Sequence, residues 1–314
     1  MSRMTTLRSI GGAIAVVLLG GATALPAGAA NAAPADPPVS VVTFNVLAPI
    51  WAAPRYYPSD LDSALLDQST RRARISDFLA GAAPQADVVC LQEVQASEFP
   101  AFQAALGRAF DGRMSTNARD YWSSWLTPGL PWQPNGTALF VRRSAIDIGT
   151  LEDVPLSADG DHAVLLDGTL RASGLRVRIG SIHLDSDRGN NRVAEARDLL
   201  SRVPADPRAL DIVCGDFNED TVTGSLSGAL ARHGFTDALA AVGNREHTHP
   251  WSSTYNRNAM WGIIDHVVVR GGHPVSGDVV DGGVWSIGDE TQRIAANFRN
   301  VGSDHFPVRA TIAP

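Results

Sequence analysis

The residues best suited to chemistry stand where apolar segments of the chain stop. The apolar run at 212–215 ends at Asp216 and Asn218, and so presents a carboxylate and an amide at one place. Five further segments or turns end in a comparable way, at Asn45, Glu93, His183, Asp265 and the pair Asp304–His305. Taken singly, each residue has an ordinary structural explanation, such as a cap, a buried histidine or a turn. Six such endings together predict one polar site at the rim of a β-sheet, where α/β proteins bind ligands.

The donor atoms of these residues favour a hard metal ion. Carboxylate and amide oxygens without a cluster of thiolates suit Mg²⁺, with Mn²⁺ and Ca²⁺ as alternatives. Protein-bound Mg²⁺ is usually held by one or two carboxylates together with phosphate oxygens of a substrate. Histidines among acids can pair with a phosphate or supply a proton to a leaving group. The residue types therefore predict metal-assisted chemistry on a phosphoester, with a neighbouring acid holding the tautomer of His305.

Eight apolar or alternating segments are typical of β-strands and must carry these side chains. They cover 39–46, 87–93, 136–142, 162–170, 175–184, the run before Asp216, 262–269 and 306–312. Helices are expected at 70–79, 99–110, 191–202 and 225–233. Because strands and helices alternate without a linker, the pattern predicts a single α/β domain over 39–314. The likeness of 87–90 to 211–214 also suggests two similar halves packed sheet on sheet.

The N-terminus has the pattern of a secretory signal peptide over residues 1–32. Arg3 and Arg8 precede an apolar run at 10–25, and small residues follow up to Ala32. Residues 33–38 are rich in alanine and proline and are expected to form a flexible lead-in. An uncleaved N-terminal anchor is the alternative. Since no later stretch is apolar enough for a transmembrane segment, we expect a secreted, extracellular protein without an obligate protein partner.

Charge and cysteine content limit the class of partner and leave one question open. The formal net charge of −7 argues against tight non-specific binding of nucleic acid, although a locally positive cleft remains compatible with it. All 26 basic residues are arginines, whose planar guanidinium suits phosphate. Cys90 and Cys214 stand in matching apolar runs. Export would permit a disulfide between them, but a bridge requires the two strands to be neighbours, and core strands such as these also accommodate free cysteines.

Six motifs together resemble those of the endonuclease/exonuclease/phosphatase superfamily, in a secreted bacterial-type form. They are VTFN at 42–45, CLQEV at 90–94, SIHL at 181–184, CGDFN at 214–218, GIIDHV at 262–267 and GSDHFPV at 302–308. They follow the family's order and span 41–312, and the first third is most similar to the nocturnin and deadenylase branch. The resemblance implies a four-layered α/β sandwich, with two packed mixed β-sheets flanked by helices, and metal-dependent hydrolysis of phosphoesters.

The resemblance also implies a role for each motif residue. Metal binding is assigned to Glu93 as the chief ligand, with Asn45 and Asp304 nearby. The catalytic residues would be His183, Asp216, Asn218, Asp265 and His305. Among these, Asp216 would orient or deprotonate the attacking water, Asn218 would hold the phosphate, and His305 would contact it with support from Asp265.

The sequence therefore predicts a secreted Mg²⁺-dependent phosphodiesterase, nuclease-like in its in-line attack of water. The alternative is a phosphatase or phospholipase C type enzyme acting on inositol phosphates, sphingomyelin or other lipid headgroups, and a remote one is a non-catalytic binding module. The substrate is accordingly nucleic acid, phospholipid or inositol phosphate. Weaker candidates for contacting it are Arg192, or else Arg188, with Trp122 and Trp125 as residues that could stack bases. His247 and His249 are expected to be solvated loop residues, with a second metal site there as a remote alternative.

Overall fold

Two six-stranded β-sheets form the centre of the computed structural model, which describes residues 36–117, 135–156, 162–250 and 262–314. The first sheet has the order β11-β12-β1-β2-β4-β3 and the second the order β5-β6-β7-β8-β10-β9. The strands of the first are β11 (His273–Val279), β12 (Val308–Ala313), β1 (Val39–Asn45), β2 (Val88–Gln95), β4 (Asn135–Arg142) and β3 (Phe110–Thr116). Those of the second are β5 (Ile146–Pro155), β6 (His162–Leu170), β7 (Arg176–His183), β8 (Ala209–Asp216), β10 (Asp265–Arg270) and β9 (Thr236–Asp237).

The two sheets are built alike. Each contains one parallel pair, β1 with β2 and β7 with β8, and every other pairing is antiparallel. The parallel pair occupies the third and fourth place in both strand orders. The likeness between 87–90 and 211–214 thus belongs to β2 and β8, which take the same place in the two sheets.

Alternation along the central strands divides each strand between two cores. Val41, Cys90, Ile179 and Cys214 belong to the apolar cluster between the sheets. Their immediate neighbours point the other way, as Val42 and Val213 do toward the helices on the outer faces. Because both faces of these strands are covered, the strands read as continuous apolar runs in the sequence.

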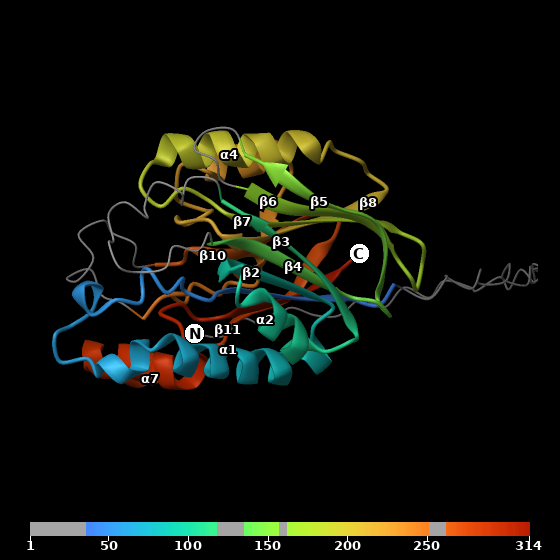
Figure 1. Ribbon diagram of the computed structural model, residues 1–314. Helices are drawn as coiled ribbons and strands as arrows, with labels where there is room; N and C mark the ends of the chain where they lie inside the picture. Colours follow the sequence, from blue (N-terminus) through green and yellow to red (C-terminus); the bar gives the residue numbers. More distant parts are fainter. Residues whose placement is uncertain (1–35, 118–134, 157–161, 251–261) are drawn as a thin grey trace, which may run out of the picture. The chain divides into compact units, whose positions relative to one another are not determined.

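Helices cover both outer faces and complete four layers (Figure 1). Below the first sheet lie α1 (Gln68–Ala82), α2 (Phe99–Leu106) and α7 (Glu290–Val301), and above the second lies α4 (Gly189–Arg202). The shorter helices are α5 (Ser227–Arg232) and α6 (Ala238–Ala241). The expected fold class, a four-layered α/β sandwich of two mixed sheets, is confirmed. No helix in the described ranges is long and apolar enough to cross a membrane.

Several elements differ from the sequence expectation. The helix expected at 99–110 ends at Leu106, and Phe110 begins β3 instead. β5, β9 and β11 were not expected, and neither was α7. Helix α1 begins at Gln68 rather than at residue 70, because Asp67 accepts a hydrogen bond from the Thr70 amide and caps its first turn.

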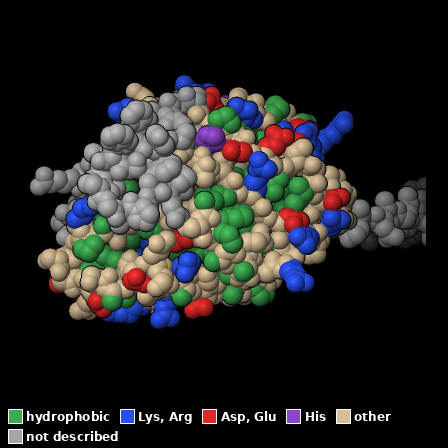
Figure 2. Space-filling view, in the orientation of Figure 1, with side chains coloured by type: hydrophobic (Ala, Val, Ile, Leu, Met, Phe, Trp, Pro, Cys, Tyr) green, Lys and Arg blue, Asp and Glu red, His purple; other side chains and the backbone are tan. Residues whose placement is uncertain are grey.

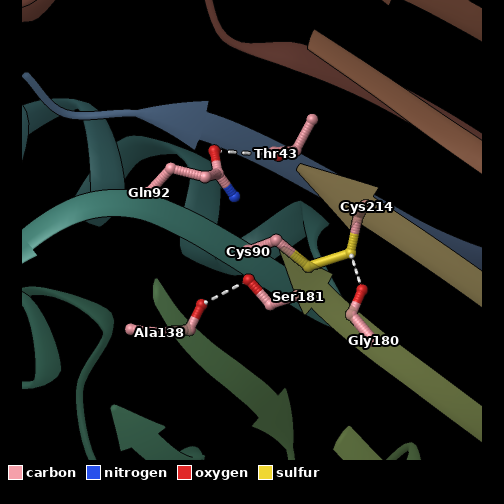
Figure 3. Close-up of a disulfide and its surroundings, with 7 residues drawn as sticks. All are labelled: Thr43, Cys90, Gln92, Ala138, Gly180, Ser181 and Cys214. Atoms are coloured by element: carbon pink, nitrogen blue, oxygen red, sulfur yellow. Dashed lines mark hydrogen bonds between the residues drawn. A yellow bond between two sulfur atoms is a disulfide. The ribbon is translucent and has the colours of Figure 1, made fainter. Parts of the chain in front are cut away.

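A disulfide between Cys90 and Cys214 joins the two sheets in their shared core. The Cα atoms are 6.2 Å apart, and Figure 3 shows the bond running from β2 to β8. In the same region Ser181 of β7 donates a hydrogen bond of 3.0 Å to the carbonyl oxygen of Ala138 in β4. The question left open by the sequence is therefore answered by a bridge between the paired central strands of the two sheets.

We predict that replacing both cysteines, Cys90→Ala with Cys214→Ala, lowers the free energy of unfolding by about 2–5 kcal/mol. The bridge closes a loop of 124 residues in sequence, so its loss increases the entropy of the unfolded chain. Urea unfolding with and without dithiothreitol measures the effect. Dithiothreitol should destabilise the wild type and leave the double variant unchanged; equal stability of wild type and variant without reductant would contradict the bridge.

Candidate active site

The polar strand ends gather at one edge of the sandwich because of the same alternation that builds the core. Asn45 lies four residues beyond Val41, His183 four beyond Ile179, and Asp216 two beyond Cys214. An even spacing keeps each on the side of its strand that faces the other sheet. Asp265 is likewise two residues before the inward Val267. The parallel pairs of the two sheets therefore direct their terminal side chains into the same space.

Polar groups from several strands and loops converge on the carboxylate of Asp216. Its Oδ2 accepts a hydrogen bond of 3.0 Å from Asn45 Nδ2, which crosses from one sheet to the other. His183 Nε2 lies 3.6 Å and His305 Nε2 3.8 Å from the same oxygen. The second oxygen, Oδ1, accepts a hydrogen bond of 2.8 Å from the Asn218 amide. Asp216 is only 1 % exposed, so these groups supply nearly all of its surroundings.

His305 is held as a cation by the acids around it. Its Nδ1 lies 2.9 Å from Asp265 Oδ2, a buried carboxylate. Burial alone would lower the pKa of His305, but the negative charges of Asp265, Asp216 and Asp304 outweigh it and raise that pKa to about 10. Because Nδ1 faces Asp265, Nε2 is the nitrogen that faces the other carboxylates. This arrangement presents an imidazolium N–H to the site.

Glu93 reaches the site through an irregular backbone. β2 has a register shift between Leu91 and Val94, and Glu93 itself has a φ of 59°. That left-handed conformation is costly for a glutamate and is typical of functional positions. The bulge turns Glu93 inward, where Oε1 accepts from Asn45 Nδ2 and Oε2 accepts from the Ala48 amide.

Asp304 and Asn218 each carry a buried oxygen that has no hydrogen-bond partner among the described residues. For Asp304 this is Oδ1, while Oδ2 accepts a hydrogen bond of 3.0 Å from the Tyr57 hydroxyl. Burial would raise the pKa of Asp304, but His249, His305 and Tyr57 lower it to about 2. Asn218, at a φ of 52°, donates from Nδ2 to the Leu184 carbonyl. Both unpartnered oxygens are suited to a cation or to a donor on a ligand.

The site also suits a divalent metal ion. Asp304 Oδ1 is unpartnered, and the described histidines and acids form two groups able to hold an ion, namely His249 with Asp304 and His305, and Asp216 with Asp265 and His305. Glu93 belongs to neither group, and its two oxygens accept hydrogen bonds from Asn45 and Ala48. Asn45 contacts the acids through its nitrogen, since its oxygen accepts from the Leu47 amide.

Eight of the twelve candidate site residues singled out from the sequence meet at this edge. They are Asn45, Glu93, His183, Asp216, Asn218, Asp265, Asp304 and His305. Arg192 lies outside the cluster in a neighbouring pocket, and Trp122 and Trp125 lie outside the described residues. The roles assigned to the eight remain proposals.

That neighbouring pocket has a volume of about 880 Å³ and is reached from Asn218. Arg192 and Arg245 line it together with Asp187, Glu219 and Asp220. Both arginines are already paired, Arg192 with Glu219 at 3.1 Å and Arg245 with Asp220. Arg188, the other arginine considered, is exposed. The lining is therefore polar and carries more acidic than basic side chains.

The expectation that His249 is a solvated loop residue was wrong. Only 5 % of the residue is exposed, and its ring packs edge to face on that of His305 at 4.8 Å between centroids. His249 Nε2 lies 3.8 Å from Asp304 Oδ2. Burial lowers the pKa of His249 to about 4. Its companion His247 is half-buried beside Trp285.

Sequence reasoning also missed Arg71, which fastens two loops of the site. Its guanidinium donates to the carbonyls of Val46 and Leu47, directly after Asn45, and to that of Gly302, just before Asp304. Arg71 is 2 % exposed. A signal was present in the sequence. Arg71 precedes Ile75 by about one helical turn and Leu79 by about two, so all three lie on the apolar face of the helix.

We predict that Arg71→Met lowers the free energy of unfolding by about 3 kcal/mol or more, because it leaves three buried carbonyls unsatisfied. Hydrolysis of phosphoesters should fall as well, since the loops carrying Asn45 and Asp304 lose their common anchor. Arg74→Met on the exposed face of the same helix is the matched control, expected within about 0.5 kcal/mol of wild type. If the Arg71 and Arg74 variants unfolded at the same urea concentration, the anchoring role would be refuted.

The fold is shared with solved structures of low sequence identity. The human nocturnin catalytic domain with bound sulfate has 21 % identity and a TM-score of 0.65, covering 88 % of this chain and 94 % of that one. TDP2 of D. rerio, complexed with single-strand DNA product, has 17 % identity and a TM-score of 0.59, with coverage of 89 % and 100 %. The Bacteroides thetaiotaomicron mannosyl-6-phosphatase has 16 % identity and a TM-score of 0.59, with coverage of 88 % and 100 %.

Sequence comparison identifies the family directly. No curated protein matches the chain significantly. The profile of the Endonuclease/Exonuclease/phosphatase family matches residues 42–305, which include all eight residues of the cluster. The chain therefore belongs to the endonuclease/exonuclease/phosphatase family of metal-dependent phosphoester hydrolases.

Proposed function

We propose that this protein is a Mg²⁺-dependent phosphodiesterase with nuclease-like chemistry. The observation that carries the proposal is the buried pair of Asp216 and His305, whose Oδ2 and Nε2 are 3.8 Å apart. Asp216 ends a strand of one sheet, and His305 precedes a strand of the other. An anionic acceptor beside a cationic donor matches the two proton transfers of ester hydrolysis.

Glu93 and Asp304 would supply carboxylate oxygens to the metal ion, with Asn45 beside Glu93. When bound, the ion would polarise a phosphate oxygen and offset its charge. Asp216 would hold a water molecule and accept its proton as the water oxygen bonds to phosphorus in line with the breaking ester bond. The imidazolium of His305 would donate a proton to the leaving oxygen. Asp265 would keep His305 oriented, and Asn218 would hold the phosphate.

A second candidate function is favoured by the pocket next to Asn218. Its acids outnumber its arginines, and both arginines are paired. On the face shown in Figure 2, acidic and arginine side chains are interspersed, without a continuous basic band over the described residues. Long nucleic acids bind along positive surfaces, so these features favour a compact substrate such as an inositol phosphate or a lipid headgroup.

A panel of DNA, RNA, phosphoinositides and sphingomyelin distinguishes the two candidates. We predict hydrolysis of nucleic acid with Mg²⁺ and none after treatment with EDTA. Asp216→Asn should lower the rate by about 10²–10⁴-fold, as expected for loss of a general base. The control Asp278→Asn changes an exposed acid on β11 and should leave the rate unchanged.

Hydrolysis of lipid or inositol phosphate alone would replace the nuclease proposal by the second candidate. Equal rates for Asp216→Asn and wild type on every substrate would refute both.

We also propose that the protein is exported and that residues 1–32 are removed. The support is the order of charge, apolar run and small residues in that segment, together with a disulfide, which persists in oxidising compartments. The predicted mature N-terminus is Ala33. Mass spectrometry of the protein from the culture medium of its host checks this, and a full-length chain confined to the membrane fraction would contradict it.

A further inference from the structure

The proposed mechanism gives no role to His249, although this buried residue lies beside Asp304, one of the two proposed metal ligands. His249 Nε2 and Asp304 Oδ2 are 3.8 Å apart, longer than a usual hydrogen bond of up to about 3.2 Å. Two ligand atoms that are each about 2.1 Å from one ion can be no more than about 4.2 Å apart. The two atoms are thus close enough to share a metal ion.

The carboxylate of Asp304 has capacity for such an ion. Its Oδ1 is buried and has no hydrogen-bond partner among the described residues, while the whole residue is only 9 % exposed. An anionic oxygen buried without a partner is costly, and a bound cation offsets that cost.

His249 is held in place from both sides. The Thr248 hydroxyl accepts hydrogen bonds from the Ile264 and Asp265 amides, each 3.1 Å long. On the other side, the Pro250 carbonyl accepts one of 2.9 Å from Arg293 Nε. These bonds tie the segment to the start of β10 and to α7, so the imidazole is presented by a fixed backbone. Ligands held in this way by their surroundings favour metal binding.

We propose that His249 and Asp304 are ligands of a second divalent cation and that this site prefers a transition ion such as Mn²⁺ to Mg²⁺. Imidazole nitrogen suits ions of the first transition series, whereas Mg²⁺ is held almost entirely by oxygen. The inference rests on the proposed metal-dependent function and refines it. Glu93 remains a ligand of the Mg²⁺ site, Asp304 would serve both cations, and His305 Nε2 remains available to the substrate phosphate.

Electron spin-echo spectroscopy of bound Mn²⁺ tests the proposal without measuring activity. With Mg²⁺ in large excess to fill the oxygen site, the wild-type protein should still bind Mn²⁺ and show nitrogen coupling from a directly bound imidazole. His249→Gln should remove the coupling and weaken Mn²⁺ binding at least about tenfold. His305→Gln should keep the coupling, and His273→Gln, which changes an exposed histidine, should behave as wild type.

Absence of nitrogen coupling in the wild type would overturn the proposal whether or not the His249 variant folds. Coupling that persists in His249→Gln, or disappears in His305→Gln, would also overturn it. Thermal unfolding of each variant identifies any loss of fold. Hydrolysis by wild type with Mg²⁺ alone is measured in parallel, so that failure of the second cation site is distinguished from failure of the phosphoesterase function.

Discussion

The hydrogen bond from Asn45 to Asp216 joins the two sheets at their polar edge, and the site depends on the packing that allows it. Asn45 and Asp216 both end the parallel pair of their sheet, and both face inward because they continue the alternation of Val41 and Cys214. The Cys90–Cys214 bridge lies two residues earlier on β8, within the apolar core. A one-residue slip of either strand would turn its terminal side chain away from the other sheet. The strand register that packs the core therefore also fixes the geometry of the site.

Gathering four buried carboxylates and three histidines, of which His249 and His305 are buried, at one edge is stable only because the groups compensate one another. Asp216 is balanced by His305 and by donors from Asn45 and Asn218, and Asp304 by Tyr57 and the neighbouring histidines. The buried guanidinium of Arg71 adds positive charge close to Asp304 and Glu93. The remaining strain is carried by Glu93 and Asn218 in left-handed conformations. The unpartnered oxygens of Asp304 and Asn218 then mark where a cation or a hydrogen-bond donor of a ligand would complete the site.

The sequence predicted the parts of this fold that are buried on both sides and missed those at its margins. All eight central strands were expected, because double burial produces apolar runs. The four edge strands β3, β5, β9 and β11 were not, since they are short or partly exposed and carry no such run. Helix α7 could have been found from its caps, Asp289 and Gly302. Eight motif residues were predicted to meet and do so. The contacts of His249 and Arg71 join distant segments, and only Arg71 had a local signal, its place on the apolar face of α1.

A crystal structure of the mature protein with Mg²⁺ and inorganic phosphate would test most directly whether the Asp216–His305 pair frames the reacting phosphate. The account predicts a phosphate whose oxygens lie within hydrogen-bond distance of His305 Nε2 and the Asn218 side chain, with a metal ion between the phosphate and the carboxylates of Glu93 and Asp304. A phosphate bound only in the pocket of Arg192 and Arg245, with none beside His305, would contradict it.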